Sequence, residues 1–128
     1  MNVTPEILVR TAARWTIDRN VALEVIRRDL NCIYCRRVFL VDLSGPRTGL
    51  PTWEHIANDL SLVSASNIAL CCWGCNASKG KKTLEEWLRS RYCQTHGITK
   101  DSIAPVAATA LEVLSGEKVV TQVDPNER

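Results

Sequence analysis

The chain has 128 residues, with 16 Lys and Arg against 14 Asp and Glu. This length favours a single domain with a modest core, to which a structural metal would add stability. Residues 1–97 hold 13 basic and 9 acidic side chains, whereas residues 98–128 hold 3 and 5. A mildly basic body with an acidic tail fits either a polyanionic partner or an ordinary solvated surface.

The sequence indicates no membrane segment and no secretion signal. No apolar run approaches the ~20 residues needed to span a bilayer, and the first residues lack a basic-then-apolar pattern. We therefore expect a cytoplasmic protein with no membrane partner. In that reducing compartment the six cysteines are metal ligands and spare thiols rather than disulfides.

Residues 1–30 predict helical structure. Thr4-Pro5-Glu6 is a helix start, and helix-spaced apolar residues continue to Leu30, as two helices or as one bent near Asp18–Asn20. The arginines of this segment either line a nucleic-acid face or simply solubilise the helix surface; they are Arg10, Arg14, Arg19, Arg27 and Arg28.

Irregular β structure is expected for residues 31–53, with a hairpin of short strands beginning at its end. Val38–Val41 is a β-rich run, residues 52–56 predict a strand that carries Glu54 and His55, and residues 67–70 predict its returning partner.

Helices are predicted for most of the remaining chain. A short one begins around residues 73–76 and stops at Gly80, and a second runs from the capping box at Thr83 to about Tyr92. Gly97 then reads as a C-cap after His96. Residues 105–114 predict a last helix, followed by a frayed polar tail that ends with residues 124–128.

The cysteine spacing predicts a metal site. Cys32 and Cys35 form one C-x-x-C pair, and Cys72 and Cys75 form another. Four thiolates make a closed tetrahedral cage for a structural Zn²⁺. Cys71 is an alternative to Cys72, but only Cys72 keeps two residues before Cys75. A redox role is disfavoured because there are two pairs and no thioredoxin-like pattern.

Between the two cysteine pairs lies the dipeptide Glu54-His55. Metal-assisted phosphodiester hydrolysis needs a base and a cation, and imidazole titrates near neutral pH. Neighbouring residues of a regular strand point to opposite faces. A shared site for Glu54 and His55 therefore requires a bulge, a twist or the end of a strand. The ordinary alternative for His55 is a surface or packing role.

These residues carry a family resemblance. Glu54-His55-Ile56, Asn67-Ile68, Cys72-Trp73-Gly74-Cys75-Asn76-Ala77-Ser78-Lys79-Gly80 and Glu86-Trp87 closely resemble the HNH endonucleases, the cysteine-bearing ββα-metal nucleases. The resemblance covers about residues 20–95. It implies an α+β fold with a small ββα-metal, treble-clef-like core, a structural zinc knuckle, and flanking N- and C-terminal helices. A single domain would comprise a helical segment (1–30), the nuclease core (31–95), and a C-terminal helix with its tail (96–128).

The resemblance also implies roles. His55 would be the general base, Asn67 would orient it, and Glu54 and Asn76 would hold a catalytic divalent cation. Lys79 would contact phosphate, and we expect Lys81 and Lys82 to bind nucleic acid with it.

The chain departs from the family in two ways. Asn76 stands where His is usual, which gives an H-N-N variant, and the loop after His55 lacks the Gly-Gly of many relatives. Asp59 in that loop is a further ligand or, as we favour, a turn residue. Carboxylate and amide oxygens suit Mg²⁺ or Mn²⁺ rather than Zn²⁺.

The sequence thus predicts a metal-dependent endonuclease that acts on DNA, and the resemblance implies 5′-phosphate and 3′-hydroxyl products. A monomer with one site would nick one strand, and a double-strand break would need a homodimer or two events. The alternative is a non-enzymatic zinc-knuckle module that binds nucleic acid or protein.

Overall fold

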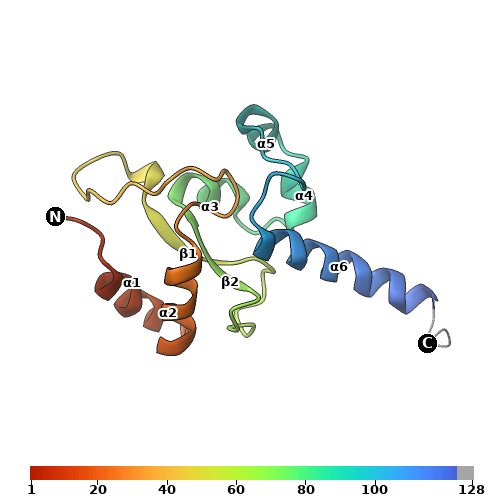
Figure 1. The fold of residues 1–128 in the computed structure, drawn as a ribbon. Coiled ribbons are helices and arrows are strands. Elements are labelled where there is room, and N and C mark those ends of the chain that lie inside the picture. Colours follow the sequence, from red (N-terminus) through yellow and green to blue (C-terminus); the bar gives the residue numbers. More distant parts are fainter. Residues whose placement is uncertain (124–128) are drawn as a thin grey trace.

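A two-stranded antiparallel hairpin lies at the centre of the computed structural model, which describes residues 1–123 and the side chains of residues 1–114. Strand β1 (Pro51–His55) pairs with β2 (Ile68–Cys72), and helix α3 (Trp73–Lys79) follows β2 directly. The fold is therefore small and α+β, as the sequence predicts (Figure 1). The remaining elements are α1 (Pro5–Ala12), η1 (Ala13–Trp15), α2 (Arg19–Arg28), η2 (Arg47–Gly49), α4 (Leu84–Leu88), α5 (Arg91–His96) and α6 (Pro105–Val123).

The amino-terminal segment forms two helices, one of the two arrangements that its sequence allows. The Thr4 hydroxyl accepts a hydrogen bond from the Ile7 amide (3.2 Å) and so caps α1, while Asp18 caps α2 through the Asn20 amide (2.9 Å). Between them Thr16 has a positive φ of 57°, which ends η1 and turns the chain.

Helix α2 protects the outer edge of β2. The Asp29 carboxylate accepts a hydrogen bond from the Leu70 amide (3.0 Å), and the Arg28 guanidinium donates to the Ile68 carbonyl (2.8 Å). These side chains, together with the Ile33 amide on the Leu70 carbonyl (3.3 Å), take the place of a third strand. The hairpin is thereby fixed against the start of the chain.

The irregular β structure predicted around Val38–Val41 does not extend to a regular strand. Only single bridges occur there, such as Asn31 with Val38, and Val38 is 73% exposed. Because this segment faces solvent and finds no long partner, its β propensity is not realised. The hairpin strands lie close to their predicted positions, with β2 extended through Cys71 and Cys72.

The helix predicted from Thr83 to about Tyr92 is divided. The Thr83–Glu86 capping box starts α4 as expected, but Ser90 adopts an extended conformation and caps a new helix, α5, through the Cys93 amide (3.3 Å). Gly97 ends α5 with a φ of 66°, the predicted left-handed C-cap. Helix α6 runs beyond the predicted end to Val123, and the tail predicted to end at residues 124–128 lies outside the described residues.

Two apolar clusters lie on either side of the hairpin. One contains Trp87 and Tyr34 with the cysteines and α4–α6; the other places Trp53 against α1 and α2. In Figure 1, α1 and α2 lie to one side of the hairpin, α3 lies next to it, and α6 extends outwards from the body. Within residues 1–123, no helix combines the length and apolar character required to cross a bilayer.

Candidate active site and metal centre

Four thiols meet behind the hairpin. The sulfur atoms of Cys32, Cys35, Cys72 and Cys75 all lie within 4.8 Å of one another, and the group could hold a metal ion such as zinc. A Zn–S bond of about 2.3 Å sets the sulfurs of a tetrahedral site about 3.8 Å apart. Cys35 Sγ and Cys72 Sγ are 3.9 Å apart, which fits that cage.

Backbone amides bond the first sulfur of each pair. In each pair the first sulfur accepts from the amide three residues later, Cys32 from Cys35 (3.5 Å) and Cys72 from Cys75 (3.4 Å). Hydrogen bonds among the four thiols lower the pKa of Cys35 and that of Cys72, the latter to about 6 with the contact to Cys32 as the largest cause, and they raise the pKa of Cys32 and Cys75. Cys71 is fully buried and contacts Thr52 instead, so the cluster contains Cys72 rather than Cys71, in agreement with the spacing.

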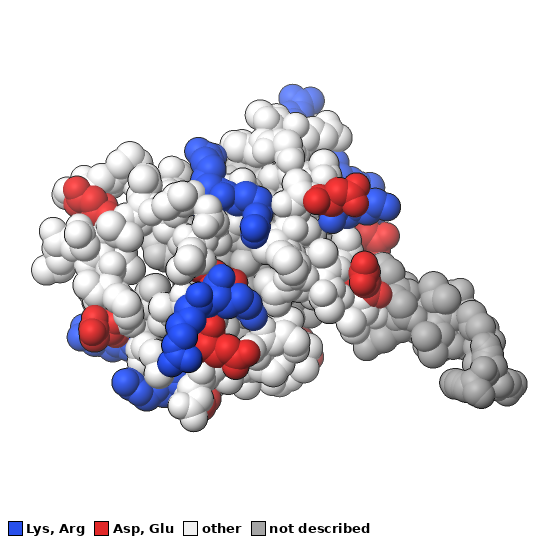
Figure 2. Space-filling model, viewed as in Figure 1, with Lys and Arg blue, Asp and Glu red and all other residues white. Residues whose placement is uncertain are grey.

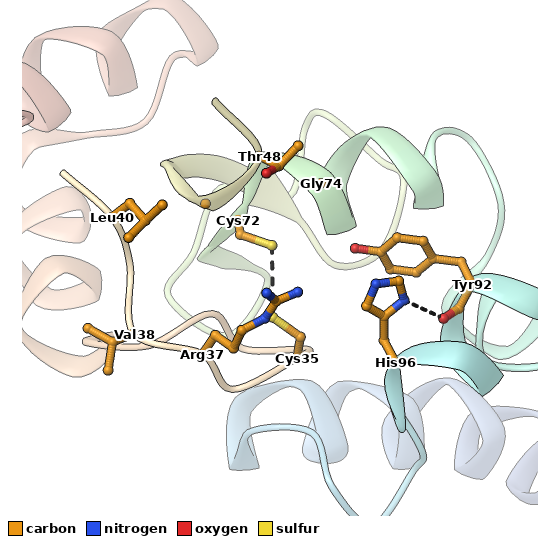
Figure 3. Close-up of a pocket in the computed structure, with 10 residues that line it drawn as sticks. Cys35, Arg37, Val38, Leu40, Thr48, Cys72, Gly74, Tyr92 and His96 are labelled. Atoms are coloured by element: carbon orange, nitrogen blue, oxygen red, sulfur yellow. Dashed lines mark hydrogen bonds between the residues drawn. The ribbon is translucent and has the colours of Figure 1, made fainter. Parts of the chain in front are cut away.

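A shallow pocket of about 330 Å³ opens beside the thiol cluster (Figure 3). Arg37 lies next to the Cys35 sulfur, and their hydrogen bond raises the pKa of Arg37. Tyr92 donates from its hydroxyl to Cys75 Sγ (3.5 Å), and the His96 ring stacks on Tyr92 with centroids 4.1 Å apart. His96 is thus a helix-end residue that packs on an aromatic ring, as its sequence context indicated.

A second pocket, of about 630 Å³, brings together residues that are distant in sequence. Glu54 and His55 from β1, and Asn76 from α3, all line it. The pocket is bounded elsewhere by Trp15 and Lys81. Three of the four residues predicted for the catalytic centre therefore share one cavity.

Glu54 and His55 point to opposite faces of β1, yet both line the same pocket. Trp53 and His55 face η1 and α1, where the Trp53 indole donates to the Leu8 carbonyl (2.9 Å) and the His55 ring lies 6.1 Å from that of Trp15. Glu54 faces the other way, towards α3. Both still line the pocket, and His55 is the last residue of β1. Because His55 is at the end of the strand, both side chains can line one pocket.

His55 is only 8% exposed, and its Nε2 atom is buried with no hydrogen-bond partner in the described part of the chain. Burial lowers the pKa of this imidazole, and Lys79 lowers it further, whereas Glu54 and Asp59 raise it. The ring therefore favours the neutral form, in which one nitrogen is able to accept a proton.

Glu54 is buried and already partnered. Its Oε2 atom accepts a 2.6 Å hydrogen bond from the Tyr34 hydroxyl and lies 3.1 Å from Lys79 Nζ. Its Oε1 atom has no partner among the described residues, and Glu54 lines the pocket whereas Tyr34 and Lys79 do not. The carboxylate thus has an inner oxygen bound by the protein and an outer oxygen that remains available.

Lys79 is the most deeply buried of the predicted DNA contacts, with 1% of its surface exposed. Besides Glu54, its ammonium donates to the Ile56 carbonyl (3.1 Å) and to Asn58 Oδ1 (3.4 Å). In this arrangement Lys79 does not reach the surface, and it ties α3 to the segment that follows His55.

Asn67 holds the same segment from the other side. Its Oδ1 atom accepts from the Ala57 amide (2.7 Å), while its Nδ2 atom donates to the Leu62 carbonyl (3.1 Å) and the Ala57 carbonyl (3.3 Å). Asn67 does not line the pocket. It therefore acts on the backbone next to His55 rather than inside the cavity.

Asn76 lines the pocket, and its amide nitrogen is already occupied by protein partners. Nδ2 donates to the Thr52 hydroxyl (2.9 Å) and to the Trp53 carbonyl (3.1 Å), and Oδ1 has no partner among the described residues. Asp59, in contrast, accepts from the Ser61 amide (3.0 Å) and hydroxyl (2.6 Å) within its own turn and does not line the pocket. This is the turn role that its sequence favoured.

The exposed basic side chains do not form one continuous stripe on the face shown in Figure 2. On that face, Lys and Arg lie in separate groups with acidic residues between them (Figure 2). Lys81 and Lys82 are exposed, and Lys81 borders the pocket. All five amino-terminal arginines are exposed, but Arg28 is bonded to Asp29 and to the Ile68 carbonyl.

Sequence reasoning missed three residues of the site. Tyr34 contacts Glu54, and the Trp15 ring lies against that of His55. Asn58 accepts from Lys79 and donates to the carbonyls of residues 81 and 82, in the turn that follows α3. Tyr34 and Trp15 carry no local signal of these roles because both contacts are made across the fold. Asn58 lies three residues after His55 in a polar loop, which is a weak signal at best.

Comparison with known proteins yields no match to a family model, to a curated protein or to a solved structure.

Proposed function

We propose that this chain is a metal-dependent DNA endonuclease of the HNH class, with a structural Zn²⁺ in its thiol cluster. The observation that carries the proposal is the single pocket lined by Glu54, His55 and Asn76, which the chain assembles from β1 and α3. A base and two hard oxygen donors in one cavity suit the hydrolysis of a phosphodiester.

His55 acts as the general base. His55 lines the pocket, and burial lowers its pKa, which favours the neutral imidazole that can take a proton from an attacking water. Attack on phosphorus with loss of the 3′ oxygen leaves a 5′-phosphate and a 3′-hydroxyl.

The donor set of the pocket fits a hard divalent cation, Mg²⁺ or Mn²⁺. Glu54 Oε1 and Asn76 Oδ1 are both oxygen atoms, both are left unpaired by the described residues, and both belong to pocket-lining side chains. When bound, such an ion would stabilise the negative charge that develops on the phosphate.

Other residues keep the base in place. Asn67 fixes Ala57, and Lys79 fixes Ile56 and Asn58, so the three residues after His55 are held from two sides. Lys81, at the rim, and Lys82 are available to phosphates of the DNA backbone. One pocket cuts one strand, so a monomer nicks, and a homodimer would be needed to cut both strands together.

Plasmid nicking tests this function. Supercoiled plasmid is incubated with the zinc-loaded protein, with and without Mg²⁺ or Mn²⁺, and nicked product is quantified on a gel. We expect nicking only with the added cation, and a loss of about 10²–10⁴-fold in His55→Ala, the usual contribution of a positioned general base. The matched control is His96→Ala, because His96 is the other histidine, is exposed and does not line this pocket; the zinc content of this variant is measured as well, since the His96 ring stacks on Tyr92 beside the thiol cluster.

The rival function is a non-enzymatic zinc module that binds nucleic acid or protein. The thiol cluster favours it equally, because that cluster needs neither His55 nor Asn76. Undiminished nicking by purified His55→Ala would refute the proposed base. DNA binding without cleavage in any divalent cation would favour the binding module.

A further inference from the structure

The Glu54 carboxylate is divided between two environments. Both of its protein contacts, Tyr34 Oη at 2.6 Å and Lys79 Nζ at 3.1 Å, are on Oε2. Neither Tyr34 nor Lys79 lines the pocket, whereas Glu54 does. The positive charge of Lys79 thus lies on Oε2, while Oε1 of this pocket-lining residue has no partner among the described residues.

Lys79 is a fixed counter-ion rather than a mobile one. It is buried, and its three donors have three acceptors in Glu54, the Ile56 carbonyl and Asn58 Oδ1. Moving it would leave a buried charge without partners, which is strongly unfavourable. The ammonium therefore stays beside Glu54 whatever the pocket contains.

The pocket consequently offers little net negative charge. Asn76 is neutral, and the single carboxylate is offset by Lys79. Affinity for a hard divalent cation rises with the number of charged ligands and with rigidity, so this donor set on its own is a weak site. A DNA phosphate brings one further negative charge to the same place.

We propose that the divalent cation and the DNA phosphate bind this pocket cooperatively, with Lys79 keeping the pocket too weakly negative to hold the cation alone. This inference rests on the proposed function, because it takes DNA as the partner. Lys79 is then a positioning residue that sets cation affinity, and the cation is acquired together with the substrate.

The test measures Mn²⁺ binding rather than cleavage. Zinc-loaded protein in a His55→Ala background, which keeps the DNA intact, is titrated with Mn²⁺ by calorimetry, alone and with a 20-base-pair duplex. We expect the duplex to tighten Mn²⁺ binding by about tenfold, within the usual range of coupling between two sites. Reciprocally, saturating Mn²⁺ should tighten duplex binding by the same factor.

Substitutions of Lys79 test whether this residue causes the weak binding of Mn²⁺ in the absence of DNA. Lys79→Met should bind Mn²⁺ about tenfold more tightly than the parent in the absence of DNA, and the duplex should then add little. Lys79→Arg retains the charge and should restore weak binding and coupling. Lys100→Met is the matched control, since Lys100 is exposed and lies outside the pocket; it should behave like the parent.

If Lys79→Met does not fold, the Mn²⁺ titrations of the parent protein with and without DNA still test the proposal. Equal Mn²⁺ affinity with and without DNA would overturn the proposal, as would unchanged DNA-free affinity in a folded Lys79→Met. If instead the proposed function is wrong, coupling between Mn²⁺ and the duplex would be observed, but the unmodified chain would not nick plasmid.

Discussion

Removal of the Asn67 side chain tests how the segment after His55 is held. Asn67→Ala loses three hydrogen bonds, of 2.7, 3.1 and 3.3 Å, and leaves the Ala57 amide without its acceptor. A typical bond contributes about 1 kcal/mol, and an unsatisfied buried amide costs about 1–3 kcal/mol. We therefore expect the free energy of unfolding to fall by about 3 kcal/mol, which lowers Tm by about 10 °C in a domain of this size.

The assay is thermal unfolding followed by circular dichroism, with zinc content measured on the same samples. Asn20→Ala is the matched control, because the Asn20 side chain is exposed and makes no hydrogen bond to a described residue, so the change should stay within about 0.5 kcal/mol. Asn67→Ala should also nick plasmid about 10²-fold more slowly, since a displaced base loses its alignment. A Tm equal to that of Asn20→Ala would refute this account of Asn67.

Three further predictions concern metal, pH and salt. Metal analysis should find about one tightly held Zn²⁺ per chain, and a stable zinc-free protein would contradict this. Cys72→Ser should lose the metal and unfold, whereas Cys71→Ser, outside the cluster, should retain it. His55 must be neutral to act, and burial lowers its pKa. The nicking rate should therefore rise with pH through a midpoint below the ordinary histidine pKa of ~6.5, and a midpoint above that value would exclude His55 as the base. DNA affinity should fall as salt rises, and Lys81→Met with Lys82→Met should reduce the log–log slope by about two, measured by fluorescence anisotropy; an unchanged slope would remove both lysines from the interface.

Local signals predicted much of the hairpin and its neighbouring helices. The capping box at Thr83, the C-cap at Gly97 and the metal spacing of the cysteines all depend on residues a few positions apart, and all three appear in the structure. The strands around His55 were also found because apolar, β-favouring residues are flanked by polar loops.

Features that depend on contacts across the fold were not predictable in this way. Val38–Val41 has strand propensity but meets no partner strand. The division between α4 and α5 follows from the extended backbone at Ser90, which the helix-type pattern did not reveal.

The sequence suggested a surface role for Lys79, yet the fold buries it against Glu54. Lysine is almost never fully buried without a partner, and its partner lies 25 positions earlier, on a strand whose orientation is set by the whole hairpin. The amide of Asn76 was expected at the site, but its orientation depends on Thr52 and the Trp53 carbonyl, which only the folded chain brings together.

Helix α3 has seven residues, fewer than the roughly 12–15 at which an isolated helix becomes even marginally stable in water. It is held at its beginning by Cys72 and Cys75 in the thiol cluster, and at its end by the buried contacts of Lys79. Grafting only residues 51–79 onto another scaffold would leave behind Cys32, Cys35 and Tyr34, and the helix would lose its anchors. A portable unit must include at least residues 31–82, which hold both cysteine pairs and the turn that Asn58 bonds, together with Trp87, which packs on Tyr34 and donates to Ser78 of α3.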